Sequence, residues 1–185
     1  TAPPEHLSQV RSNALQLYDA LVDAGIQPIA PRDRLCLSLA AKLYRIGASL
    51  HFYQYQKHSF HMIAHTRIDG LSHREMLITA LIASFKTKNR TQQAIQQHRD
   101  ILLDSDVELI CRLGVLLQLS VALDISETQA LEIAAVFAEG TALHLRLRTK
   151  HDPSAEYREV EGLAKDFKKL WGMPLKIHEP SFSKS

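Results

Sequence analysis

The amino-acid sequence predicts a mostly α fold, in which a helical bundle over residues 1–125 precedes a small α+β appendage of ββαβ order over residues 126–185. Before residue 125, apolar residues recur every three or four positions, which is the period of a helix with one buried face. Between 131 and 147 they recur at every second position, as in a strand, and helical spacing returns over Ser154–Trp171. The joint Asp124–Thr128 has no Pro/Gly-rich linker, so we expect the two parts to pack together.

Two helices are expected in the first 48 residues. The first starts at Glu5, and Gly25 stands where a helix commonly ends in the left-handed conformation. Pro28 supports a break there, because proline cannot continue a helix. Pro31 then fits the first turn of a second helix, which we expect to run to about Ile46.

Three more helices are expected before the appendage. One begins near Gln54 and carries the string QKHSFHMI. Another covers Met76–Phe85 and follows Ser72 and Glu75, which have the spacing of a capping box. The last runs to about Leu123 and is apolar on nearly every side, so we place it at the centre of the bundle.

The appendage is expected to begin with a β-hairpin that turns at Glu139-Gly140 and to end with a third strand over Pro174–Ile177. Successive side chains of a strand point to opposite faces, so every second residue should be buried. These residues are Leu131, Ile133, Ala135 and Phe137 on the first strand, and Leu143, Leu145 and Leu147 on the second.

Composition is that of an ordinary globular protein, with 45% hydrophobic and 23% charged residues over a length of 185. No apolar run is long enough to span a membrane, and the start TAPPEHLSQ lacks the layout of a signal peptide. Cys36 and Cys111 both lie in apolar helical patterns, so we expect reduced core thiols and a cytoplasmic location, although a disulfide between them stays open. Neither cysteine has a cationic setting, and no phosphate loop or nucleophile elbow occurs, so we expect no catalytic centre in this chain.

Charge is distributed unevenly along the chain. Residues 31–100 contain eleven Lys and Arg against four Asp and Glu, a net charge of +7, whereas the whole chain has only +2. Six of the ten histidines lie in the same window. Because the potential of one face governs association with a polyanion, this window is the candidate binding region.

Four stretches carry a family resemblance: AAKLYRIG, QKHSFHMI, IDGLSHRE and LLQLSVALDIS. They resemble the C-terminal region of the exopolyphosphatase/guanosine pentaphosphate phosphohydrolase (Ppx/GppA) family over roughly residues 5–126. The resemblance implies an HD-like helical domain whose partner is an N-terminal actin-like catalytic half. It also implies Mg²⁺ in the full-length enzyme, inorganic polyphosphate or guanosine pentaphosphate as ligand, and a homodimer. A start without Met suggests a piece trimmed from something longer.

The HD pattern is degenerate at its centre. In an HD domain, Leu43–Gly47 would read Leu-His-Asp-Ile-Gly, and the His-Asp pair would bind a metal. Here the pair is Tyr44-Arg45, a neutral phenol and a fixed cation. By the resemblance, His6 and Asp124 keep two of the four ligand positions. They could form a residual metal site with a histidine of QKHSFHMI, or hydrogen-bond to each other with Arg45 replacing the metal charge; we favour the second and expect no metal.

Candidate phosphate-binding residues all fall in the basic window. Arginine offers a planar fork for two oxygens and lysine a mobile point charge. The alternatives are that the histidines fix one helix to its neighbours and that the cations of Lys86–Arg90 offset the dipole at the end of the preceding helix. The candidates are Arg45, Lys57, His58, His61, Arg67, Lys86, Lys88 and Arg90.

Three functions compete at this point. The first is the C-terminal domain of an exopolyphosphatase-type enzyme, which binds polyphosphate and supports hydrolysis by the N-terminal half. The second is a stand-alone metal-dependent HD phosphohydrolase acting on a nucleotide, against which Tyr44-Arg45 argues. The third is a non-catalytic polyanion-binding or dimerisation module, because a basic helical face does not identify its polyanion.

Overall fold

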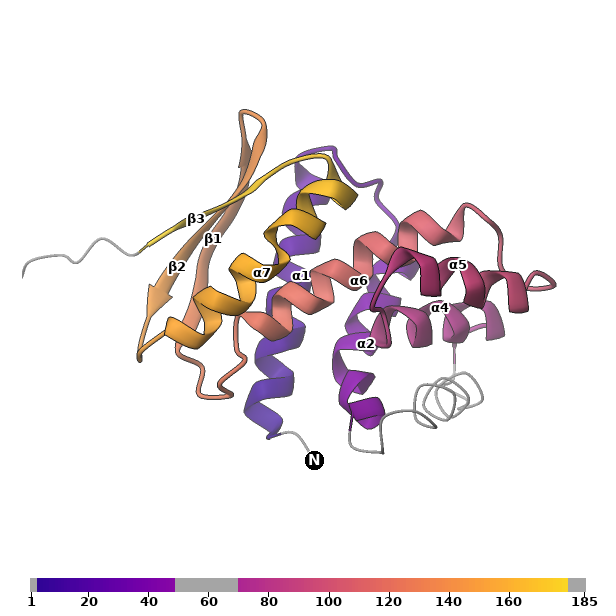
Figure 1. The fold of residues 1–185 in the computed structure, drawn as a ribbon, viewed down its shortest axis with the longest axis horizontal. Helices are drawn as coiled ribbons and strands as arrows, with labels where there is room; N and C mark the ends of the chain where they lie inside the picture. Colours follow the sequence, from indigo (N-terminus) through magenta and orange to yellow (C-terminus); the bar gives the residue numbers. More distant parts are fainter. Residues whose placement is uncertain (1–2, 49–69, 180–185) are drawn as a thin grey trace, which may run out of the picture. The chain divides into compact units, whose positions relative to one another are not determined.

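A computed structural model describes residues 3–48 and 70–179 of the chain (Figure 1). This part holds six helices and one three-stranded sheet, so the mostly α class with a small α+β part is confirmed. The helix expected near Gln54 lies outside the described residues. The elements are α1 (Pro4–Asp23), α2 (Pro31–Ala48), α4 (His73–Ala83), α5 (Lys88–Gln97), α6 (Asp106–Ala122), β1 (Leu131–Glu139), β2 (Ala142–Thr149), α7 (Ser154–Trp171) and β3 (Leu175–His178).

The chain divides into two compact units. The helical unit contains residues 30–117, and the mixed unit contains residues 3–29 together with 118–185. The first helix therefore groups with the sheet: Gln9 Nε2 donates to the carbonyl of Leu131, and Asn13 Nδ2 donates to the carbonyl of Ser120. The sequence predicts a domain boundary near residue 125, where the spacing of apolar residues changes from helical to strand-like. This domain boundary stays a prediction.

In the helical unit, α4 packs against α2 along an almost continuous apolar surface. Every residue from Met76 to Ile82 is buried, which explains why this helix shows little amphipathic pattern. Its N-terminus has the predicted capping box: Ser72 Oγ accepts from the N–H of Glu75, and the Glu75 carboxylate accepts from the N–H of Ser72. This reciprocal cap satisfies two of the N–H groups that a helix start leaves without partners.

Helix α5 was missing from the sequence prediction, which placed residues 86–90 in a segment after the preceding helix. In the structure, Thr87 caps α5 by accepting from the N–H of Arg90 at 3.2 Å, so Lys88 and Arg90 belong to its first turn. Only Thr91 and Ile95 are buried on this helix. Such a polar segment has too few apolar residues to show a helical period, which is why the prediction failed.

The sheet of the mixed unit has the order β1-β2-β3. β1 and β2 form the predicted antiparallel hairpin, and β3 returns after α7 to pair parallel with β2. Figure 1 shows α7 running alongside these strands. The core of this unit includes Leu131, Ile133, Leu143, Leu145 and Leu147 from the sheet, and Val160, Phe167 and Trp171 from α7.

A β-bulge in β1 changes which residues of that strand face the core. Ile133 is opposite Leu147, but Ala135 is opposite Arg146, so Ala134 is the additional residue of the bulge. The phase of the side chains reverses beyond this point. Phe137 therefore pairs with His144 and is only partly buried. The prediction that Ala135 and Phe137 share a buried face with Leu131 was wrong for this reason.

Candidate functional site

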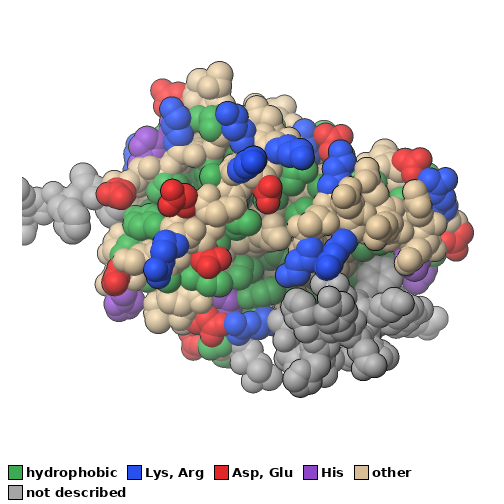
Figure 2. All heavy atoms as spheres, in the orientation of Figure 1, with side chains coloured by type: hydrophobic (Ala, Val, Ile, Leu, Met, Phe, Trp, Pro, Cys, Tyr) green, Lys and Arg blue, Asp and Glu red, His purple; other side chains and the backbone are tan. Residues whose placement is uncertain are grey.

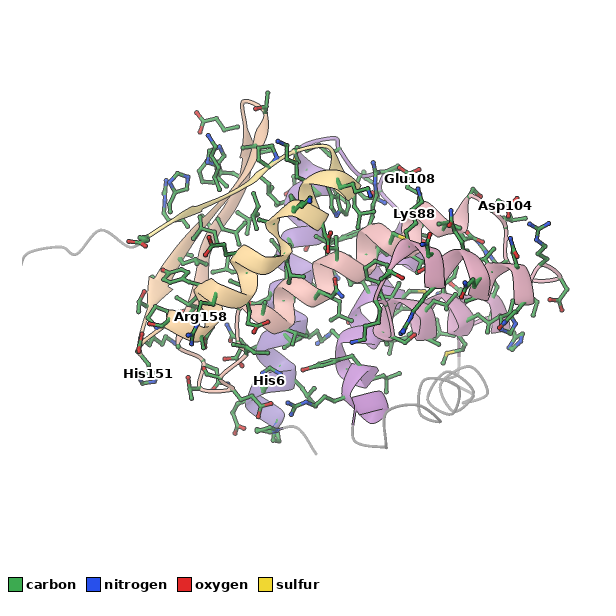
Figure 3. The ribbon with its side chains drawn as sticks, in the orientation of Figure 1. His6, Lys88, Asp104, Glu108, His151 and Arg158 are labelled. Carbon is green, nitrogen blue, oxygen red and sulfur yellow. The ribbon has the colours of Figure 1, made fainter. Side chains whose placement is uncertain are left out.

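The two residues that the resemblance assigns to HD positions meet inside the mixed unit. His6, on the first turns of α1 (Figure 3), and Asp124, just after α6, are 1% and 0% exposed. His6 Nδ1 donates to Asp124 Oδ2 at 2.7 Å. The Gln129 side chain donates to the same oxygen at 3.0 Å, and the backbone N–H of Gln129 donates to Oδ1 at 2.8 Å. Three donors thus surround this buried carboxylate.

The loop after α6 is shaped around the Asp124 carboxylate. Glu127 and Gln129 adopt φ values of 61° and 53°, a left-handed conformation that is costly for residues with a side chain. These two residues turn the chain so that Gln129 can donate twice to Asp124. A buried charge of this kind is tolerated only when it is hydrogen-bonded, so the loop and His6 together stabilise Asp124.

This geometry matches the hydrogen-bonding interpretation of His6 and Asp124. Within residues 3–48 and 70–179, no group of three or more His, Cys, Asp or Glu side chains could hold a metal ion. The described donor set therefore does not fit the Mg²⁺ expected for the full-length family. Arg45 belongs to the other unit, so its predicted place beside Asp124 stays a prediction.

A neighbouring carboxylate, Glu156 on α7, was missed in the sequence. It is fully buried, and its Oε1 accepts from Ser126 Oγ, which also lies 2.8 Å from Thr128 Oγ1. Its Oε2 has no hydrogen-bond partner among the described residues. Glu156 therefore ties the loop that follows Asp124 to the start of α7, a contact that no periodicity in the sequence indicates.

Two arginine–carboxylate pairs organise the helical unit. Arg32 donates to both oxygens of Glu75, at 2.6 and 2.7 Å, and also to the carbonyl of Gly70. The hydrogen bond from Arg32, helped by the N–H of Ser72, lowers the pKa of Glu75 to about 2. Arg32 and Glu75 are 43 positions apart, so only the fold brings them together.

The second pair joins Arg74, on the first turn of α4, to Asp106, on the first turn of α6. Arg74 donates to both oxygens of Asp106, at 2.6 and 2.7 Å, and the N–H of Leu103 donates at 2.8 Å. Burial alone would raise the pKa of Asp106, but the hydrogen bonds from Arg74 and Leu103 lower it below its ordinary value. Burial raises the pKa of the neighbouring Asp33.

Ion pairing weakens the positive electrostatic field of the basic window, residues 31–100. Its described part carries nine Lys and Arg, and at least three of them pair with carboxylates: Arg32, Arg74 and Arg99. On the face drawn in Figure 2, Lys and Arg side chains lie among Asp and Glu side chains. The charge count from sequence therefore overstates the number of cations available to a polyanion.

The described phosphate-binding candidates fall into two places. Arg45 is partly buried near the end of α2, whereas Lys86, Lys88 and Arg90 are exposed around the start of α5. Lys88 and Arg90 belong to the first turn of α5, and the alternative that they offset the dipole of α4 stays a prediction. The other candidates lie outside the described residues: Lys57, His58, His61 and Arg67.

Both cysteine thiols are free and buried. Burial raises the pKa of Cys36 and of Cys111, which disfavours the thiolate needed for reaction. Neither residue is therefore a candidate nucleophile.

Comparisons with known proteins identify one family. The model of the Ppx/GppA phosphatase domain III family matches residues 4–162, which include the helical unit and the mixed unit as far as the middle of α7. The comparison with curated proteins found no match. No helix in the described ranges has the length and apolar content needed to cross a membrane.

Proposed function

The chain belongs to the Ppx/GppA phosphatase family and contains its domain III, and from this premise we propose that it binds inorganic polyphosphate. Hydrolysis of the terminal phosphoanhydride takes place in an N-terminal actin-like domain of the same protein, which also supplies the Mg²⁺ site. Domain III contributes no catalytic residue. Its role is to hold the chain of phosphates while the terminal phosphate is cleaved, in the cytoplasm and as part of a homodimer.

The arrangement of charge around the start of α5 carries this proposal. A helix N-terminus has partial positive charge and favours acidic residues in its first turn. The first turn of α5 contains no acidic residue, and Lys86, Lys88 and Arg90 add three cations at that end. Positive side chains at the positive end of a helix make that end favourable for an anion, so Lys86 and Lys88 with the helix N-terminus give this end the character of a phosphate site.

Polyphosphate is a better fit than a small anion. It presents many identical charges on one flexible chain, so weak contacts at separate cations add through effective concentration. Arg45 and the candidates of the QKHSFHMI segment are the further contacts that we propose for a long chain of phosphates. Guanosine pentaphosphate, with five phosphates, would engage fewer of these contacts.

Calorimetric titration with long-chain polyphosphate tests the proposal. Lys88→Glu/Arg90→Glu and Lys57→Glu/Arg67→Glu should each weaken binding by at least tenfold and reduce its dependence on salt, because phosphate contacts are lost. The matched control is Lys165→Glu/Lys168→Glu, which makes the same charge change at exposed positions of α7. We expect the control to change affinity by no more than about twofold.

Single-stranded DNA at matched charge and salt separates polyphosphate binding from general polyanion binding. Preference for polyphosphate supports the proposal. Equal binding of DNA would favour a generic polyanion module. No binding of either polymer, or equal losses in the control variant, would contradict the proposal.

A further inference from the structure

Two histidines on neighbouring strands meet on the face of the sheet that is turned away from its core. His144 lies on β2 and His178 on β3, and Phe137 is opposite His144 on β1. His144 Nδ1 and His178 Nε2 are 2.7 Å apart, and this contact is exposed to solvent. The two residues are 34 positions apart, and no local pattern in the sequence indicates that they meet.

The second nitrogen of His144 has a defined role. His144 Nε2 lies 3.1 Å from the carbonyl oxygen of Glu139. A carbonyl only accepts, so Nε2 must carry the hydrogen. In the neutral imidazole Nδ1 then has the lone pair, and it accepts from Nε2–H of His178. The Glu139 carbonyl thus fixes the tautomer whose free lone pair points at His178.

The ring of His144 is also fixed in orientation. It stacks on Phe137 with centroids 5.1 Å apart and planes 6° apart, and it meets His178 edge to edge, with centroids 5.0 Å apart and planes 17° apart. Arg146 covers the Phe137 ring at 5.5 Å from its centroid. The side chains that position His144 therefore leave it little freedom to turn Nδ1 away from His178.

We propose that His144 and His178 form a binding site for a divalent transition-metal ion of the zinc and copper type. Two imidazole nitrogens aimed at one point suit such ions, and a ligating histidine commonly donates its other N–H to a carbonyl, as His144 does. Metal–nitrogen distances of about 2.0–2.1 Å in tetrahedral geometry separate the nitrogens by roughly 3.3 Å. The two nitrogens need to move apart by roughly 0.6 Å, and the exposed ring of His178 must also turn so that both lone pairs point at the metal.

Binding requires one internal proton shift. His144 keeps its hydrogen on Nε2 and binds through Nδ1. Neutral His178 moves its hydrogen from Nε2 to Nδ1 through solvent, which frees the Nε2 lone pair, so no net proton is released. Water completes the coordination, because the protein supplies two ligands.

The surrounding charges decide which ions are suitable. Lys176 is opposite His144, and Arg146 is opposite His178, so the strands place two cations beside the site. Hard ions such as Mg²⁺ depend on carboxylate oxygens and would be disfavoured. Transition-metal ions bind neutral imidazole strongly enough to tolerate this field, although with lower affinity than at a site of four protein ligands.

Zinc chloride titrated alone into the 185-residue chain tests the site. His144→Gln and His178→Gln should each weaken one zinc-binding event by at least tenfold, while His151→Gln, at an exposed histidine after the opposite end of β2, should leave that event within twofold. Loss of the event in all three variants, or in none, would contradict the proposal.

A second measurement separates this pair from any other histidine that binds zinc. Nitrogen NMR of the imidazole rings should show His178 changing from the Nε2–H to the Nδ1–H tautomer on zinc addition, while His144 keeps Nε2–H. His151 should not change. An unaltered His178 tautomer at saturating zinc would also refute the site.

Discussion

At the scale of single residues, Asp124 shows how a position associated with metal binding can serve as a structural acceptor. Its carboxylate is fully buried and receives hydrogen bonds from His6 and from the backbone and side chain of Gln129. The contact between His6 and Asp124 spans 118 positions. The family resemblance pointed to both residues, but only the structure shows that their side chains are hydrogen-bonded to each other.

Asp124→Asn should destabilise the protein by about 2–4 kcal/mol, because the amide nitrogen would face the donors of His6 or Gln129 and leave buried groups unpaired. Chemical denaturation at neutral pH measures this loss. The exposed Asp166→Asn is the control and should stay within about 0.5 kcal/mol of the wild type. A similar result for both variants would mean that the buried hydrogen bonds of Asp124 contribute little.

Glu75 gives the protein a defined response to acid. Its pKa falls from 4.5 to about 2 in the folded state, so its contribution to stability is complete above pH 4.5 and is lost as pH falls through 2. Glu75→Gln should therefore show a smaller loss of unfolding free energy than the wild type between about pH 6 and pH 3. Urea denaturation of both proteins at pH 6 and at pH 3 measures the loss of unfolding free energy. Equal losses in the variant and the wild type would exclude a role for Glu75.

At the scale of elements, α5 combines weak helix-forming signals with a specific charge arrangement. Lys88→Glu replaces a cation with an anion at the positive end of the helix and should raise stability by about 0.3–1 kcal/mol. The same variant should weaken polyphosphate binding. Thermal denaturation and calorimetry on one sample check both effects. A variant that loses stability and binding together would indicate a structural role for Lys88 instead.

Close packing between α6 and Phe85, two positions after the end of α4, depends on a glycine. A Cβ added at Gly114 would lie 2.3 Å from Cγ of the Phe85 ring, which is closer than such atoms approach in proteins. Gly114→Ala should therefore destabilise the fold by about 1–3 kcal/mol through overpacking. Gly162→Ala is the matched control, because α7 has open space there.

The control variant should change stability in the opposite direction. Alanine is a better helix former than glycine, so Gly162→Ala should stabilise the protein by about 0.5–1 kcal/mol. Denaturation curves of the two variants should therefore shift in opposite directions. Equal shifts would mean that helix propensity, and not the contact with Phe85, dominates at Gly114.

At the scale of the whole molecule, the two compact units contain the residues of two separate proposals, polyphosphate binding and zinc binding. The described cations around α5 belong to the helical unit, whereas His6, Asp124 and the His144–His178 pair belong to the mixed unit. Polyphosphate binding and zinc binding should accordingly respond to different substitutions. The family match includes residues of both units and ends within α7, at residue 162.

Much of the fold could be predicted from local pattern. Apolar spacing located α1, α2, α4, α6 and α7, and alternation located the hairpin and β3. Helix α5 could not be located, because a helix with two buried residues has no apolar stripe to detect. The bulge at Ala134 could not be located either, since one additional residue reverses the facing of a strand without altering its composition.

The sequence by itself determined the mostly α class, the family strings and the presence of Tyr44-Arg45 within them, because each is defined by consecutive residues. Only the tertiary structure decided which distant charges neutralise one another and which histidines meet. Arg32 with Glu75, and His144 with His178, are joined by helix packing and strand register. Such contacts depend on how the whole chain folds, and no spacing of neighbouring residues in the sequence predicts them.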